Sequence, residues 1–268
     1  MASNKREREL ARMRAERQAA RRAAEEARRK QRRNGIFAGI AALAVIAVVV
    51  TVALVVGLGG DEKKTPSTVT ATGSTKYGNS GGEGSCTYTK QGDAARKLDG
   101  IPPTSKVKTT GTQKVTFETT QGTIKADLFT SKAPCTVNSL KFLADQGFYD
   151  NTPCPRIVTS GIFVLQCGDP TGTTGGGPGY VYADENLQGA TYPAGTLAMA
   201  NAGAGTNGSQ FFLVYKDTQL PPSYTPFGKI TSGLDVIAKV AAKGDDGSNS
   251  AGGGKPKLAI SLKKVTVV

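Results

Sequence analysis

A run of 23 residues without a charge, Ile36–Leu58, limits most strongly how this 268-residue chain can fold. As a helix rising about 1.5 Å per residue, it would be about 35 Å long, slightly more than a bilayer's hydrocarbon core of about 30 Å. A buried core helix is the alternative, but one without any polar face would be unusual. A cleaved signal peptide has a shorter apolar region, about 7–15 residues, and a small-residue cleavage site. The run therefore predicts an uncleaved transmembrane signal anchor.

Residues 1–35 form a basic arm before this run. Between Lys5 and Arg33, thirteen basic and five acidic residues give a net charge of +8, out of +13 for the whole chain. The positive-inside rule then places the N-terminus in the cytoplasm and the bulk of the chain outside, as a single-pass protein of the cell membrane. We expect the arm to bind anionic lipid headgroups. Nucleic acid is not the expected partner, because the arm has no aromatic residue to stack on bases.

The chain beyond the apolar run divides into three parts. Residues 59–85 are rich in Thr, Ser and Gly and lack apolar periodicity, which predicts a flexible linker. We expect residues 86–112 to form an extended strap that packs against the domain, although their pattern does not define its structure. Residues 113–268 are numerous enough for a single hydrophobic core.

All four cysteines, Cys86, Cys135, Cys154 and Cys167, follow the apolar run. An even number on the external side predicts disulfides, with buried free thiols as the alternative. Three pairings are possible. Cys154 and Cys167 flank a predicted hairpin, which favours their pairing and leaves Cys86 for Cys135. The chain has no histidine and no Cys-x-x-Cys pair, so we expect no zinc site.

The sequence of residues 113–268 predicts many short strands and two helices. Alternation over 115–120 and 124–129, with a turn at Gln121-Gly122, predicts a hairpin. Pro134 marks the start of a helix ending near Gly147, and a second helix is predicted over 234–240. Further strands are expected over 161–166, 195–200, 210–214, 226–230 and 258–268. This pattern favours a closed barrel capped by the helices.

Two apolar runs of the domain each carry an isolated amide side chain. Leu197–Gly203 contains Asn201, and Asn207–Phe212 contains Gln210. Amides among Phe, Leu and Met favour a groove that binds a peptide backbone by hydrogen bonds while apolar residues hold a side chain. The alternative interpretation is that the two runs are simply core strands joined by a turn, and either run alone would not exclude it.

The pair of runs closely resembles the central signature of the cyclophilins, the peptidyl-prolyl cis-trans isomerases. Matching pieces occur in the same order from about residue 113 to the C-terminus: Phe148-Tyr149-Asp150, Arg156, Phe163–Gln166, Gly168-Asp169, the Gly-rich loop 171–179, Asp184-Glu185-Asn186, the two runs, and Pro226-Phe227-Gly228. The resemblance implies a mostly β fold, a closed antiparallel eight-stranded barrel capped by two helices, here preceded by one transmembrane helix.

The resemblance also implies the residues of the site. The catalytic set would be Arg156, Gln166, Asn201 and Gln210, and the substrate-binding set Phe163, Val164, Ala200, Ala202, Phe212, Leu220 and Tyr224. The amide barrier to be lowered is about 18–20 kcal/mol. A guanidinium can hydrogen-bond the nitrogen of a twisted amide, so the reaction needs no nucleophile, metal or cofactor.

This chain departs from the family pattern around these residues. Two extra residues separate Arg156 from Gln166, Pro155 and Tyr224 stand where histidine is common, and the chain has no tryptophan. Because the arginine and amides are present, we expect isomerisation of X-Pro bonds in unfolded or exported polypeptides. A non-catalytic proline-peptide binding or chaperone module of the cell envelope is the alternative. A serine or cysteine hydrolase is disfavoured, since no histidine can act as base.

Overall fold

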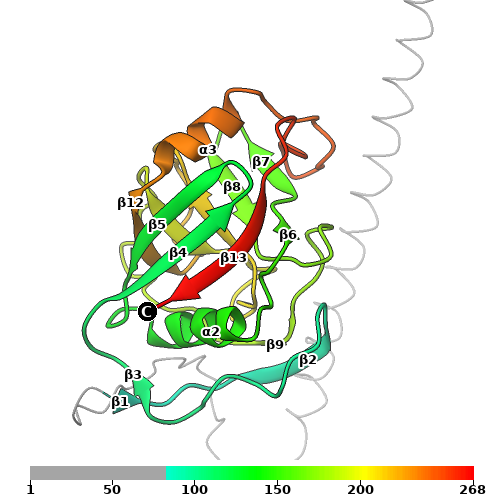
Figure 1. The fold of residues 1–268 in the computed structure, drawn as a ribbon. Helices are drawn as coiled ribbons and strands as arrows, with labels where there is room; N and C mark the ends of the chain where they lie inside the picture. Colours follow the sequence, from blue (N-terminus) through cyan, green and yellow to red (C-terminus); the bar gives the residue numbers. More distant parts are fainter. Residues whose placement is uncertain (1–82) are drawn as a thin grey trace, which may run out of the picture. The chain divides into compact units, whose positions relative to one another are not determined.

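The computed structural model describes residues 83–268, shown in colour in Figure 1. The expected arm and apolar run, and most of the expected linker, lie outside the described residues. Among the helices of residues 83–268, none combines the length and the apolar character needed to cross a bilayer.

The domain is built around one antiparallel sheet of nine strands, in the order β6-β13-β4-β5-β12-β10-β11-β8-β7. Its strands are β4 (Gln113–Thr119), β5 (Gly122–Leu128), β6 (Thr152–Pro153), β7 (Arg156–Val158), β8 (Val164–Cys167), β10 (Thr196–Met199), β11 (Phe211–Val214), β12 (Pro226–Ser232) and β13 (Ser261–Val267). The predicted hairpin is confirmed as β4 and β5, which pair from Gln113↔Leu128 to Thr119↔Gly122.

The sheet curls as a half-barrel, and its ladder does not close into the expected eight-stranded barrel, because β6 and β7 remain as its two ends. These end strands are consecutive in the chain, with only Cys154 and Pro155 between them. Proline cannot donate to a ladder, so Pro153 and Pro155 interrupt what would otherwise be one strand. The interruption gives nine strands rather than eight, with β6 paired to β13 and β7 paired to β8.

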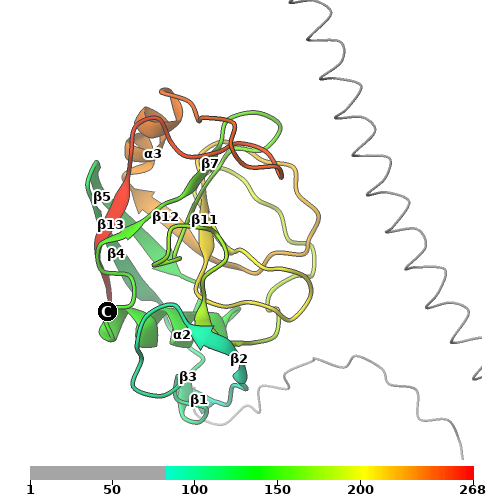
Figure 2. The same ribbon diagram turned by 90° about the vertical axis from the view of Figure 1, so that its right-hand side faces the viewer.

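Two helices lie at opposite ends of the curled sheet, α2 (Pro134–Asp145) and α3 (Leu234–Ala241), close to their predicted positions (Figures 1 and 2). Proline suits the first turn of α2, where its missing N–H would have no partner. The Glu185 carboxylate caps this turn from a distant loop. It accepts the N–H groups of Cys135 at 3.0 Å and Thr136 at 2.8 Å, and the Thr136 hydroxyl at 2.7 Å.

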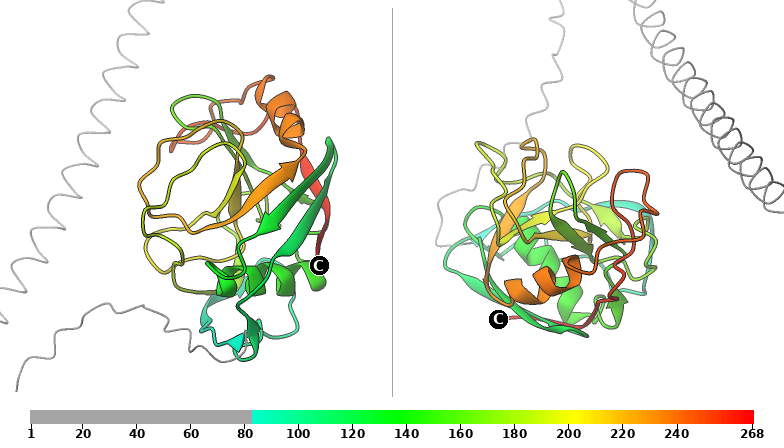
Figure 3. Two further views of the ribbon diagram at one scale, coloured as in Figure 1. Left: turned by 90° about the vertical axis from the view of Figure 1, so that its left-hand side faces the viewer. Right: turned by 90° about the horizontal axis from the view of Figure 1, so that it is seen from above.

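Strands β10 and β11 are buried on both faces, as is β8 except at Gln166, which explains why these segments are mostly apolar rather than alternating. In β11, Phe211 and Leu213 belong to the main core, whereas Phe212 and Val214 belong to a second apolar cluster on the other face. The long connections between β8 and β12, yellow-green to yellow, gather on the side of the sheet away from β4 and β13 (Figures 2 and 3). These connections cover the second cluster.

The residues before β4 run along the end of the domain near α2, as an extended strap. They include β1 (Glu83–Gly84), β2 (Thr89–Ala94) and β3 (Val107–Lys108). Strand β1 pairs with β3, and β2 pairs with β9 (Pro178–Val181). Sequence patterns did not reveal these pairings, because each short strand finds its partner far along the chain.

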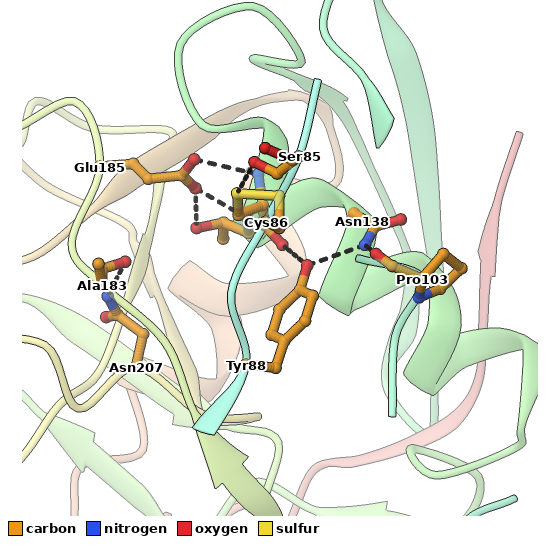
Figure 4. The surroundings of a disulfide bond; sticks show 10 residues. Ser85, Cys86, Tyr88, Pro103, Asn138, Ala183, Glu185 and Asn207 are labelled. Carbon is orange, nitrogen blue, oxygen red and sulfur yellow. Dashed lines mark hydrogen bonds between the residues drawn. A yellow bond between two sulfur atoms is a disulfide. The ribbon is translucent and has the colours of Figure 1, made fainter. Parts of the chain in front are cut away.

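The start of the strap is anchored to α2 by the Cys86–Cys135 disulfide (Figure 4). The Tyr88 hydroxyl donates to the carbonyl of Cys135 at 2.9 Å and accepts from Asn138 Nδ2 at 2.8 Å. The second disulfide is Cys154–Cys167, so the favoured pairing is confirmed for all four cysteines. Further along, Arg96 Nη1 donates to three backbone carbonyls of residues 147–150 at 2.7–3.0 Å, which anchors the other end of β2.

We predict that Glu185→Gln lowers the free energy of unfolding by about 1–3 kcal/mol, because a buried charged acceptor at a helix N-terminus is replaced by a neutral one. Urea unfolding followed by circular dichroism measures the loss. The matched control is Glu118→Gln, which neutralises an exposed carboxylate on β4 and should cost less than about 1 kcal/mol. Equal losses for both variants would contradict the capping role.

Candidate functional site

The site begins with a row of residues that lie opposite one another on four neighbouring strands. Ala198 of β10 pairs with Phe212 of β11, Phe212 with Gln166 of β8, and Gln166 with Arg156 of β7. Residues paired directly across a sheet share one face. The row therefore places an apolar floor and a guanidinium on the same surface, the face that carries the second apolar cluster.

A chain of hydrogen bonds starts at Arg156 and crosses this face. Arg156 Nη1 donates to Gln166 Oε1 at 3.1 Å, and Gln166 Nε2 donates to Gln210 Oε1 at 2.8 Å. Gln210 Nε2 then donates to the carbonyls of Thr174 at 2.9 Å and Gly176 at 2.8 Å. Because a guanidinium can only donate, the order of donors and acceptors along the chain is fixed.

The other side of the guanidinium is held by the loop before β13. Arg156 Nε donates to the carbonyl of Gly252 at 2.9 Å, and Nη2 donates to that of Ala251 at 3.0 Å. Reciprocal backbone bonds between Ile157 and Gly254, of 2.8 and 3.0 Å, fasten this loop to β7. With the bond to Gln166, three of the five guanidinium N–H groups are used, which leaves two donors for a ligand.

Beside Arg156 lies a small hollow of about 150 Å³. We call it the ring hollow; it is lined by Arg156, Ile162, Val164, Gln166, Ala200, Asn201, Phe212, Leu220 and Tyr224. Tyr224 is fixed by its backbone, which accepts from the Tyr192 hydroxyl at 2.8 Å and donates to it at 3.1 Å. An apolar cavity of about 150 Å³ holds a single small ring such as benzene. The ring hollow thus combines an apolar floor with one cationic wall.

A larger hollow of about 560 Å³ adjoins the ring hollow and shares Gln166, Ala200 and Asn201 with it. We call it the side hollow. Its walls are the Gly-rich loop 174–179, residues 200–202 and 206–210, and residues 91–93 of the strap. Asn201 is held in place by the loop before β12, since its Nδ2 donates to the Ser223 carbonyl at 2.8 Å.

The side chain of Asp169 holds the Gly-rich loop in place by hydrogen bonds. Its buried carboxylate accepts the N–H groups of Thr171, Thr173 and Gly176 at 2.8–3.2 Å and the Thr171 hydroxyl at 2.7 Å. A Cβ on Gly176 would collide with this carboxylate, so a larger residue there would displace it from its hydrogen bonds. Burial alone would raise the pKa of Asp169, but the hydrogen bonds outweigh it and leave the pKa below its usual range.

Most residues predicted from the sequence lie at these two hollows, and one does not. Ala202 and Gln210 line the side hollow, and the remaining predicted residues apart from Phe163 line the ring hollow. Phe163 lies outside both linings, and its ring contacts Tyr215 at a centroid distance of 6.0 Å. Ile162 and Val164, the residues on either side of Phe163, line the ring hollow instead.

Sequence reasoning missed two other parts of the site. The carbonyls of Ala251 and Gly252, which hold Arg156, belong to a Gly- and Ser-rich loop that carries no side-chain signal. The strap residues Gln91, Gly92 and Asp93 reach the side hollow only because β2 pairs with β9. Both contributions arise from contacts between segments about 90 residues apart in the chain.

The electrostatics of the site are dominated by Arg156. Burial lowers the pKa of its guanidinium and the neighbouring Tyr224 opposes this shift, but the group stays protonated at neutral pH. Within residues 83–268, no three His, Cys, Asp or Glu side chains cluster as a metal site would require. The Cys154–Cys167 disulfide brackets the row, since Cys154 lies two residues before Arg156 and Cys167 directly follows Gln166.

Comparisons with known proteins agree with this geometry. The family model described as "Cyclophilin type peptidyl-prolyl cis-trans isomerase/CLD" matches residues 114–267. The chain is 44% identical over 195 residues to "Probable peptidyl-prolyl cis-trans isomerase B" of Mycobacterium tuberculosis, which covers 67% of this chain and 63% of that protein. It is 47% identical over 182 residues to the protein of the same name from Mycobacterium leprae, covering 60% and 62%.

A solved structure shows the same fold. The crystal structure of a cyclophilin type peptidyl-prolyl cis-trans isomerase from Cryptosporidium parvum matches with a TM-score of 0.54 and 32% identity, over 59% of this chain and 98% of that chain. The chain therefore belongs to the cyclophilin-type peptidyl-prolyl cis-trans isomerase family. It spans less than two thirds of the length of the mycobacterial relatives.

We predict that Asp169 makes the domain sensitive to acid. A carboxyl whose pKa is lowered by folding contributes stability above its unfolded pKa of about 3.9 and loses that contribution as pH falls through the folded value. The difference in unfolding free energy between wild type and Asp169→Asn should therefore be constant above about pH 5 and shrink below about pH 4.

Denaturant unfolding at several pH values between 3 and 7 measures this difference. The control is Asp99→Asn, which removes an exposed carboxylate and should remain close to wild type throughout. A gap for Asp169→Asn that stays constant down to pH 3 would contradict the assignment.

Proposed function

We propose that this protein accelerates the cis-trans isomerisation of X-Pro peptide bonds in unfolded or exported polypeptides. The observation that carries the proposal is the Arg156 guanidinium, held by Gln166, Ala251 and Gly252 at the wall of an apolar hollow of ring size. Membership of the isomerase family supports the same activity. A related Cryptosporidium parvum cyclophilin has been crystallised in the presence of the dipeptide Ala-Pro.

Binding would begin with the proline ring in the ring hollow. Burying three CH₂ groups contributes about 2.4 kcal/mol at about 0.8 kcal/mol each. Val164, Phe212 and Leu220 line the ring hollow and would supply the apolar contact to the ring. Holding the ring still while the preceding residue remains free to rotate is the first requirement for isomerising the bond between them.

Catalysis requires that the twisted amide bind better than either planar isomer. Twisting ends the delocalisation of the nitrogen lone pair into the carbonyl, which makes the nitrogen a hydrogen-bond acceptor. The two remaining N–H donors of Arg156 can bind this nitrogen only in the twisted state. Because the guanidinium is already fixed by three acceptors, little reorganisation opposes the contact, and no nucleophile or proton transfer is involved.

We predict that Arg156→Ala lowers kcat/KM by about 10- to 150-fold, since a hydrogen bond to a charged group contributes about 1.5–3 kcal/mol. The loss should fall mainly in kcat, because the contact forms in the twisted state. Arg156→Lys should recover little, because an ammonium cannot bind Gln166 and two loop carbonyls as a planar guanidinium does. An X-Pro isomerisation assay with the full-length protein measures all variants.

The matched control is Arg96→Ala, the other arginine in residues 83–268. Arg96 also donates to backbone carbonyls, but outside the ring hollow. Its loss should lower the unfolding free energy with far less effect on kcat than the loss of Arg156. A folded Arg156→Ala variant with full activity would refute the catalytic assignment.

We also propose that residues 36–58 anchor the protein in the cell membrane, with residues 1–35 in the cytoplasm and on anionic lipid, and the isomerase domain outside. The uncharged run and the basic arm before it support this topology. Protease added outside wall-free cells should release a fragment that begins within residues 61–85. The arm should become sensitive to trypsin only after permeabilisation, whereas a domain protected in intact cells would overturn the orientation.

A further inference from the structure

The strap contributes a bulge to the groove. In the pairing of β2 with β9, Lys90 lies opposite Tyr180 and Ala94 lies opposite Pro178. Three strap residues, Gln91–Asp93, therefore face one residue of β9, Gly179. The chain between the paired ends must project outward, as extra residues in a bulged strand do.

The bulge is built into the fold on both strands. Gly179 has a φ of +77°, and a Cβ there would lie 2.9 Å from the backbone nitrogen of Ala94. Glycine at this position thus permits the close approach of the strap. On the strap, Gly92 has a φ of +70° at the tip of the bulge. The Cys86–Cys135 disulfide before the bulge and the Arg96 hydrogen bonds after it fix its position.

The bulge forms one wall of the side hollow, which adjoins the ring hollow through Gln166, Ala200 and Asn201. An extended peptide advances about 3.3–3.6 Å per residue, so a side chain within two residues of a bound proline can reach this space. The lining consists of glycine, small residues, amides, hydroxyls, Tyr180 and Val181, with a single charged side chain, Asp93. The one charge in the lining of this hollow is therefore contributed by the strap.

Given the proposed isomerase function, we propose that the bulge Gln91–Asp93 is a specificity element and that Asp93 selects a lysine or arginine side chain near the isomerised proline. A cationic side chain entering the side hollow meets one carboxylate and no competing cation among the lining residues. A carboxylate entering the same space is repelled. Because Asp93 is exposed, water and salt weaken both effects.

The test uses a set of X-Pro peptides in which one position at a time carries Lys, Gln or Glu. The varied positions are the two before and the two after the X-Pro pair. Both kcat/KM and the peptide dissociation constant are measured with the full-length protein at low and at high salt. At one position, Lys should be favoured over Glu by about 2- to 20-fold at low salt, an effect that shrinks at high salt. Asp93→Asn should abolish most of this ratio, and Asp93→Lys should reverse it.

The matched control is Asp99→Asn, which removes another exposed strap carboxylate outside the side hollow and should keep the wild-type ratio. A Lys-to-Glu ratio that Asp93→Asn leaves unchanged, or the absence of a charge preference at every position, would overturn the inference. If the wild-type protein binds the peptides but does not accelerate their cis-trans exchange, the isomerase proposal is refuted and the proposal for Asp93 is not. The dissociation constants would then still decide the role of Asp93.

Discussion

The fixed guanidinium of Arg156 is the interaction on which the rest of the site depends. Three acceptors hold it, and they come from β8 and from the loop before β13, which meet only in the folded domain. The bond to Gln166 also starts the hydrogen-bond chain that reaches Gln210 and the Gly-rich loop. One half-buried cation thus orients two amides and connects the walls of both hollows.

This arrangement requires a sheet that is buried on both faces. The main core packs under β8, β10 and β11, and the second cluster, with Phe212 and Val214, packs on the opposite face under long loops. A strand with one solvated face would offer no apolar floor for a proline ring. The two-sided burial therefore serves stability and binding together, and it explains why a groove can lie on the outside of a curled sheet.

Sequence patterns reveal the parts of this fold whose signals are local. The β4–β5 hairpin, both helices and the amide-bearing runs depend on periodicity and turn residues within a few positions. The pairing of β2 with β9 and the loop contacts of Arg156 depend on segments distant in the chain, which no local pattern encodes. Phe163 shows a different limit, because the family resemblance placed it in the groove, whereas its neighbours Ile162 and Val164 line the ring hollow and its own ring contacts Tyr215.

Catalysis, rather than binding, is the central claim, because a groove that only holds proline peptides would have the same apolar floor. Magnetisation exchange between the cis and trans signals of an X-Pro peptide, recorded with a small amount of the full-length protein, separates the two directly. Uncatalysed exchange takes tens of seconds or longer. A fixed guanidinium that stabilises the twisted amide predicts exchange within about a second or less. Signals that shift on binding while exchange stays at the uncatalysed rate would contradict this account.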